Sequence, residues 1–309
     1  MKKKSFIALT LCAVCGVSSI AQPIGASKPE LLLKYEHGLM APVWSPTGDR
    51  IAVTTDNYTG ILVADANGSN LMPLTQEAGA GYKMCWSNDG SMILGRTNVE
   101  ENRLMLHEVK VWNVNNGSSR TIIEKTREIT GTPLWENAGN VAVAYRSGIK
   151  SFNLKTSKER ILSQSNVYSI MVNDPANAAC KISSLKEFED KIIINPSISA
   201  DNSTIAFQIP GKGIYTCTAD GSQVKFICKG SHPTWLPDGK TIVYTVVSDD
   251  GSRFTESHLF AINTTTMKSV ELVGGSDIIP LTPAVSPDGK KVAFENAADA
   301  AIYVISLKY

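Results

Sequence analysis

The stretch W-S-P-T-G-D-R-I-A-V, residues 44–53, decides the fold, because versions of it recur along the chain. It joins a five-residue turn motif to an apolar segment. Proline and aspartate favour the start of a tight turn, and glycine accepts the positive φ that closes it. Further copies, some weaker, begin at Trp86, Trp135, Ile198, Trp235 and Val285. Six copies predict six structural repeats.

Each copy is followed by a short apolar run of the kind that forms a β-strand. These runs are residues 51–53, 92–94, 141–143, 205–207, 242–244 and 292–294. Further strands follow in several units, with turns at Asn67-Gly68, Asn116-Gly117 and Asp220-Gly221. Four short strands in a unit of about 40–50 residues are typical of a propeller blade. No long stretch has helical periodicity, so we predict an all-β, six-bladed β-propeller with four-stranded antiparallel blades.

The third and fourth copies are unusually far apart, with 63 residues from Gly139 to Asn202. This interval exceeds one blade but is shorter than two. We interpret residues 166–190 as an insertion in which residues 184–189 could be helical. A degenerate seventh blade is the alternative.

The last repeat is one strand short. After residues 292–294 only one further strand, residues 301–307, fits before the chain ends at Tyr309. The apolar segment Glu30–Tyr35 could supply the missing strand. We therefore predict that the N-terminal strand joins the last blade, closes the ring and removes an exposed sheet edge.

The N-terminus has the pattern of a secretory signal peptide. Three lysines at positions 2–4 precede an apolar run over residues 6–17, and Ser19-Ile20-Ala21 places small residues before a cleavage site. We predict cleavage after residue 21, which leaves a propeller over residues 22–309 in the periplasm or secreted. The apolar run is too short to span a bilayer comfortably, so no membrane span is expected after cleavage.

Net charge and cysteine spacing bear on nucleic-acid binding and on disulfide formation. The formal charge of the whole chain is +1, which gives no bias towards nucleic acid. The mature chain keeps Cys85, Cys180, Cys217 and Cys228 without a C-x-x-C pair. A two-residue turn at 220–221 would place Cys217 opposite Val224 and Cys228 opposite Gly213, so we favour free thiols over a disulfide.

The W-S-P-D-G turn, the I-A-F-like strands and the ending Leu74-Thr75 resemble the repeat of TolB-like propellers. The resemblance covers essentially the whole mature chain and implies a six-bladed propeller. The same repeat forms the propeller half of prolyl-oligopeptidase-type enzymes. The chain has no G-x-S-x-G motif, however, so we expect neither a hydrolase domain nor the additional N-terminal α/β domain of TolB.

In such a propeller the first strand of each blade lines a central channel, and the loops on one face form the usual binding surface. Projecting the repeat onto this sequence predicts binding residues around that channel face. They are His37, Tyr58, Lys83, Arg96, Arg146, Asn195, His232, Arg253 and Asp277.

The recurring tryptophans are expected to pack between adjacent blades, because every blade needs a large apolar side chain at that position. Trp112 lies outside this series, and the sequence leaves its role open.

These features predict an exported, non-catalytic binding or scaffold protein, monomeric, with an envelope or extracellular protein as its partner. No cofactor or resident metal is expected. The alternative is a small propeller enzyme acting on a carbohydrate or peptide, with His37 and His232 in a metal or base role. TolB-like lyases that act on pectic fragments use a histidine cluster in the channel, which keeps this alternative open.

Overall fold

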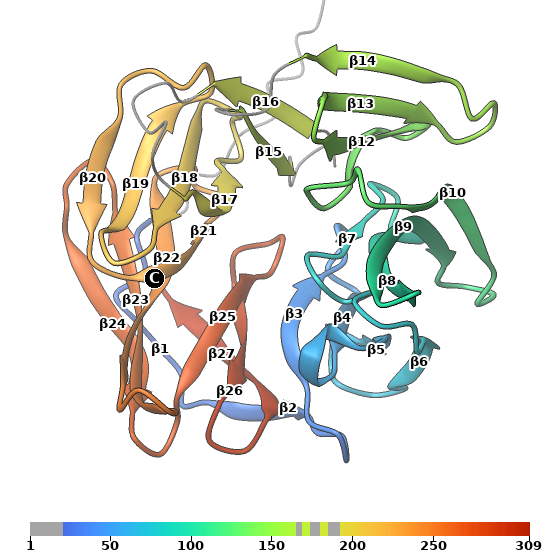
Figure 1. Ribbon diagram of the computed structural model, residues 1–309. Coiled ribbons are helices and arrows are strands. Elements are labelled where there is room, and N and C mark those ends of the chain that lie inside the picture. The colour runs from blue at the N-terminus through green and yellow to red at the C-terminus, as the bar shows by residue number, and fades with distance from the viewer. Residues whose placement is uncertain (1–20, 165–168, 174–179, 185–191) are drawn as a thin grey trace, which may run out of the picture.

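A computed structural model describes residues 21–164, 169–173, 180–184 and 192–309, with only the backbone given for 169–173 and 180–184. The chain forms six blades of four antiparallel strands arranged in a ring (Figure 1), which confirms the predicted β-propeller. No α-helix occurs in these residues, and a 3₁₀ turn, η1 (Asp56–Tyr58), connects two strands. The predicted signal peptide lies outside the described residues except for Ala21.

The first three blades follow one another along the chain. Blade 1 consists of β3 (Met40–Trp44), β4 (Arg50–Thr54), β5 (Ile61–Asp65) and β6 (Met72–Thr75). Blade 2 consists of β7 (Cys85–Trp86), β8 (Met92–Glu101), β9 (Leu104–Asn113) and β10 (Ser119–Thr126). Blade 3 consists of β11 (Leu134–Asn137), β12 (Asn140–Tyr145), β13 (Gly148–Asn153) and β14 (Glu159–Ser163).

The other three blades complete the ring. Blade 4 consists of β17 (Ile194–Ile198), β18 (Thr204–Ile209), β19 (Gly213–Thr218) and β20 (Lys225–Cys228). Blade 5 consists of β21 (Ser231–Trp235), β22 (Thr241–Asp249), β23 (Phe254–Asn263) and β24 (Ser269–Gly275). Blade 6 has β25 (Pro280–Val285), β26 (Lys291–Asn296) and β27 (Ala301–Lys308).

The N-terminal segment supplies the fourth strand of blade 6, as predicted. It does so in two pieces, β1 (Gly25–Ala26) and β2 (Glu30–Leu33), and both pair with β27. Leu33 is buried against residues of blades 1 and 6, whereas Leu31 on the same strand is exposed. The outer edge of the last blade is therefore covered by the start of the described chain.

The turn motif makes the first connection of each blade, and in blades 1, 2, 4 and 6 a serine at its second position holds the turn together. In blade 2, the Ser87 hydroxyl donates to the Asp89 carboxylate and accepts the backbone N–H of Met92. Equivalent bonds run from Thr204 N–H to Ser199 and from Lys291 N–H to Ser286. The serine thus satisfies a backbone donor that the tight turn leaves without a sheet partner.

Four seams between blades share a tryptophan hydrogen bond. The indole N–H of Trp86 donates to the backbone oxygen of Val43 in the preceding blade, at 3.1 Å. Trp44, Trp135 and Trp235 make the same bond to Ala284, Cys85 and Ser197. The predicted packing role is confirmed. Trp112, by contrast, is buried in β9 and donates to Glu77.

The predicted insertion forms a two-stranded antiparallel sheet, β15 (Ser169–Asn173) with β16 (Cys180–Ser184). The sheet lies between blades 3 and 4, beside their innermost strands (Figure 1). Blade 4 has Ile198 in place of the tryptophan, so the sheet occupies a seam without that hydrogen bond. The described residues show two of the four strands that a seventh blade would need, and the helix considered at 184–189 lies outside them after Ser184.

The thiols of Cys85, Cys217 and Cys228 are free. One detail of the predicted register is wrong, because Cys228 pairs with Ile214 and not with Gly213. A bulge in β20, opposite Ile214 and Tyr215, shifts the pairing by one residue. Burial raises the pKa of the Cys217 thiol to about 12, so this cysteine is protonated at neutral pH.

Candidate functional site

The two faces of the ring differ because the strands of each blade alternate in direction. The turn motifs, which connect first to second strands, lie on one face, here called the turn face. The connections between second and third strands lie on the opposite face, here called the hairpin face. The hairpin face also receives the segments that enter each innermost strand.

Five blades carry a residue with left-handed backbone at the same repeat position, three residues before the motif start and within or just before the innermost strand. These residues, here called the bulge ring, are Ala41, Lys83, Asn195, His232 and Thr282, with φ between 45° and 53°. Bulges interrupt the pairing of β3, β17, β21 and β25 at this point. Positive φ is uncommon for residues other than glycine, and such strain concentrates at functional sites.

Gln208, on the second strand of blade 4, connects two residues of this ring with Ser231. Its side-chain oxygen accepts the Asn195 amide at 2.9 Å and the His232 backbone N–H at 3.2 Å. Its own amide donates to the Ser231 hydroxyl at 3.0 Å. Blades 4 and 5 are thus joined through one side chain.

Glu295 has the same role between blades 6 and 1. Its carboxylate accepts the Thr282 hydroxyl at 3.1 Å and the Ala41 backbone N–H at 3.3 Å. Burial raises the pKa of Glu295, although these two hydrogen bonds partly offset the shift.

Lys83 reaches from blade 2 to blade 4, so it crosses the centre of the ring. Its ammonium group donates to the Asn195 side-chain oxygen at 2.5 Å. The residue is solvent-exposed, yet the protein that surrounds its amine lowers the pKa of Lys83. Burial and the nearby Lys83 charge lower the pKa of His232 to about 4, so the imidazole is neutral at pH 7.

Tyr58, Tyr82 and Arg96 form a second group on this face. The two tyrosine rings meet edge to face, with centroids 4.9 Å apart. The Arg96 guanidinium lies 5.8 Å from the centre of the Tyr82 ring and donates to the Gly131 oxygen of blade 3 at 3.3 Å. Arg96 therefore links blade 2 to blade 3.

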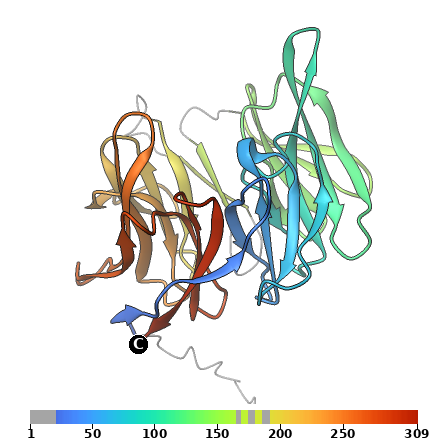
Figure 2. The same cartoon turned by 90° about the horizontal axis from the view of Figure 1, so that it is seen from below.

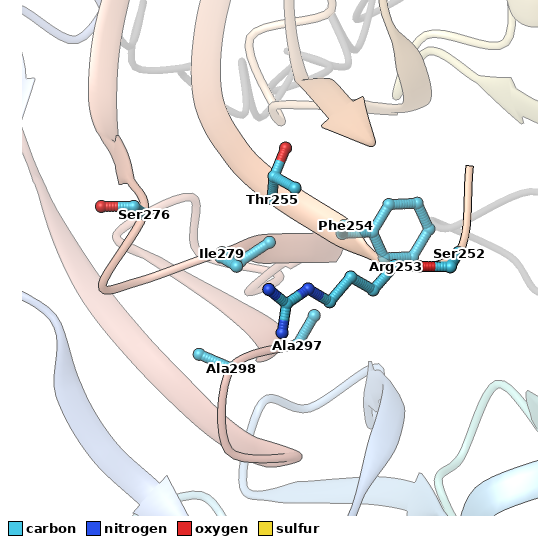
Figure 3. A pocket seen from close by; sticks show the side chains of 8 residues that line it. All are labelled: Ser252, Arg253, Phe254, Thr255, Ser276, Ile279, Ala297 and Ala298. Atoms are coloured by element: carbon cyan, nitrogen blue, oxygen red, sulfur yellow. The ribbon is translucent and has the colours of Figure 1, made fainter. Parts of the chain in front are cut away.

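A pocket of about 540 Å³ lies between blades 5 and 6 on the hairpin face (Figure 3). Arg253 and Phe254 line it from the tip of the β22–β23 hairpin, and Ile279, Ala297 and Ala298 line it from blade 6. The Arg253 guanidinium is largely exposed and pairs with Asp250 at 3.5 Å. The pocket thus combines one cation with apolar side chains and the hydroxyl groups of Ser252, Thr255 and Ser276.

The remaining predicted binding residues lie on exposed loops. His37 is beside Glu36 and Tyr35, while the bulge-ring position of its blade is Ala41. Arg146 lies in the β12–β13 turn, and Asp277 precedes β25. Over residues 21–164 and 192–309, no three His, Cys, Asp or Glu side chains are arranged to hold a metal ion. None of the helical segments in these ranges has the length and apolar character to span a membrane.

The sequence analysis did not find Gln208, Glu295 or the Tyr82 contact. The signal for the first two was present, because both follow the apolar triplet of their second strand. Comparing that position across the repeats would have identified polar side chains directed at the neighbouring innermost strand.

Solved structures with the same fold include several propellers. An oligogalacturonate lyase from Vibrio parahaemolyticus superimposes with a TM-score of 0.61 at 12% identity, over 93% of this chain and 98% of the lyase. The Cps50 (Swd1) β-propeller domain of Myceliophteria thermophila gives 0.63 at 11% identity, over 88% and 97%. A putative TolB from Agrobacterium tumefaciens gives 0.54 at 16% identity, over 89% and 92%.

No protein-family model matches the sequence, and no curated protein matches it. The structural matches confirm the resemblance to TolB-like propellers at the level of the fold. Because all three are below 25% identity, they establish the architecture alone.

Proposed function

We propose that this chain is an exported propeller that binds a protein partner through its hairpin face. The N-terminal signal-peptide pattern supports export, and the use of this fold as a rigid support for loops supports binding. The observation that carries the proposal is the pair of long hairpins that project from this face.

These two hairpins come from blades 2 and 5. β8 and β9 are paired from Met92–Asn113 to Glu101–Leu104, and β22 and β23 from Thr241–Asn263 to Asp249–Phe254. Figure 2 shows both hairpins, coloured teal-green and orange, extending from the same side of the ring. Other blades make this connection with short turns, so the extensions are not needed to build a blade.

The hairpin tips carry exposed apolar side chains. Leu104 is 44% exposed, Met105 52% and Phe254 47%. Methionine and aromatic residues are enriched in protein interfaces, where an apolar centre is surrounded by polar groups. Here the charged residues Glu101, Arg103, Asp250 and Arg253 flank the apolar ones. Two tips separated by the width of the ring suit a folded partner better than a small molecule.

The alternative of a small propeller enzyme rests on the fold shared with an oligogalacturonate lyase. Its proposed residues lie in different settings, with His37 on an exposed loop and His232 in an innermost strand. Stoichiometric divalent metal in the purified protein, lost in His232→Ala, would favour this alternative.

The test is affinity capture from an envelope fraction with the mature protein as bait. We expect Met105→Glu combined with Phe254→Glu to reduce recovery of the captured partner at least tenfold. The control is Met72→Glu combined with Ile161→Glu, at exposed positions on the outermost strands β6 and β14. Equal recovery with both double variants would refute binding through the hairpins. N-terminal sequencing of the exported protein should begin at Gln22.

A further inference from the structure

Lys83 is a cation at the centre of the ring that has no counter-ion among the described residues. Its hydrogen-bond partner is the neutral amide of Asn195, and no carboxylate pairs with it among the residues that the structure describes. Lys110 in the same blade shows the ordinary arrangement, in which Glu77 and Glu108 surround the ammonium group. The Lys83 charge is therefore not neutralised within the described protein.

The groups that the structure describes around Lys83 add no negative charge. Asn195 and Gln208 are neutral amides, and His232 is near enough for the Lys83 charge to disfavour protonation of its imidazole. His232 Nδ1 is buried and has no hydrogen-bond partner in the described part of the chain. A positive potential surrounded by protein attracts an anion more strongly than the same charge on an open surface.

The backbone at these positions supports a functional role. Lys83, Asn195 and His232 all have left-handed φ, a region that asparagine and histidine adopt more often than lysine does. Lysine there costs free energy that folding does not require, since glycine or asparagine would be easier to accommodate. Because Ala41 and Thr282 share this backbone, the conformation itself belongs to the repeat, and it is the choice of lysine at this position that points to a ligand.

We propose that Lys83, Asn195 and His232 bind a small anion with carboxylate or phosphate oxygens at the centre of the hairpin face. Lys83 supplies the charge and has two N–H donors beyond the one directed at Asn195. Asn195 holds the ammonium group in place, and the neutral His232 imidazole can add one donor. This site goes beyond the protein-binding function, because it requires no partner protein.

The experiment is an NMR titration of the mature protein with sodium phosphate and, separately, sodium acetate at constant ionic strength. Chemical shifts of the Asn195 and His232 backbone amides should change saturably with at least one anion. The anion that binds more tightly identifies the class of ligand. Lys83→Asn should weaken binding at least tenfold, and asparagine is compatible with the left-handed backbone there.

Two further variants separate charge from structure. Lys83→Arg keeps the cation and should bind within about threefold of the wild type, since arginine also recognises oxyanions. Lys290→Asn removes an exposed lysine from a blade 6 turn motif, on the turn face, and should leave binding unchanged.

Asn195→Asp tests the missing counter-ion directly. The substitution replaces the amide oxygen that accepts the Lys83 hydrogen bond with a carboxylate, so Lys83 gains a counter-ion within the protein. Anion binding should fall at least tenfold although Lys83 is still present. Linear, non-saturating shifts, or equal affinity in Lys83→Asn and the wild type, would overturn the proposal. Because no partner protein is added, this result is independent of the capture experiment.

Discussion

Gln208 and Glu295 occupy the same position in blades 4 and 6 but differ in charge. Each accepts a backbone N–H from the following blade and a side-chain donor from its own blade. The amide does this without cost of ionisation. The carboxylate is half-buried at the seam where the ring closes, and its raised pKa means that the fold disfavours its charged form.

We therefore expect Glu295→Gln to stabilise the protein at pH 8 by about 1 kcal/mol. The pKa of Glu295 is higher in the folded protein than in the unfolded chain, so protonation of this residue favours the folded state. The resulting stabilisation is fully present at pH values below the unfolded pKa. That stabilisation is lost as the pH rises through the folded pKa. The gain from the substitution should accordingly shrink as the pH falls towards 4.5.

The measurement is urea unfolding of both proteins between pH 4.5 and 8. Glu124→Gln, at an exposed position, serves as the control and should change stability by less than about 0.5 kcal/mol at every pH. If Glu295→Gln destabilised the protein at pH 8, the negative charge of Glu295 would contribute to stability at this seam, and the expectation would be wrong.

At the scale of elements, the innermost strands are joined by the tryptophan hydrogen bonds. Trp86 is buried between blades 1 and 2, and its indole satisfies a carbonyl of β3. The two seams without this bond follow blades 3 and 5, where the next motif begins with Ile198 or Val285. The β15–β16 sheet lies at the first of these seams, and the Arg253 pocket lies at the second.

Trp86→Phe should destabilise the protein by about 2 kcal/mol, because it removes indole volume and leaves the Val43 oxygen without its donor. Ile198→Val is the matched variant at the same repeat position, where no such bond exists, and should cost about 1 kcal/mol. Urea unfolding measures both. A Trp86→Phe effect no larger than that of Ile198→Val would contradict an energetic role for the hydrogen bond.

At the scale of the whole molecule, the two ends of the described chain meet in one sheet. β2 pairs with β27, and Leu33 enters the apolar cluster between blades 6 and 1. A ring holds together only if every seam is closed, so a local loss at this point reaches the whole fold.

Leu33→Ala should therefore lower the free energy of unfolding by about 3 kcal/mol, the usual cost of a large-to-small change in a core. Leu31→Ala, on the same strand but with an exposed side chain, should change it by less than about 0.5 kcal/mol. Thermal unfolding of the two variants, followed by circular dichroism, makes the comparison. Equal midpoints would mean that the N-terminal strand does not stabilise the ring.

The sequence by itself determined the blades, because their information is local. A turn motif with serine, aspartate and glycine specifies a connection within about five residues, and alternation specifies the strand beside it. The repeated tryptophan predicted the packing between blades for the same reason. Even the closing strand at Glu30–Leu33 followed from counting strands in the last repeat.

Only the tertiary structure decided which residues meet at the centre of the ring. Lys83 and Asn195 are 112 residues apart in the chain, and their contact depends on how the blades are spaced around the ring. The repeat pattern likewise did not predict the lengths of the β8–β9 and β22–β23 hairpins. Nor did it predict the one-residue bulge in β20. Local propensities set strands and turns, whereas closure of the ring sets distances between blades, and those distances create the candidate site.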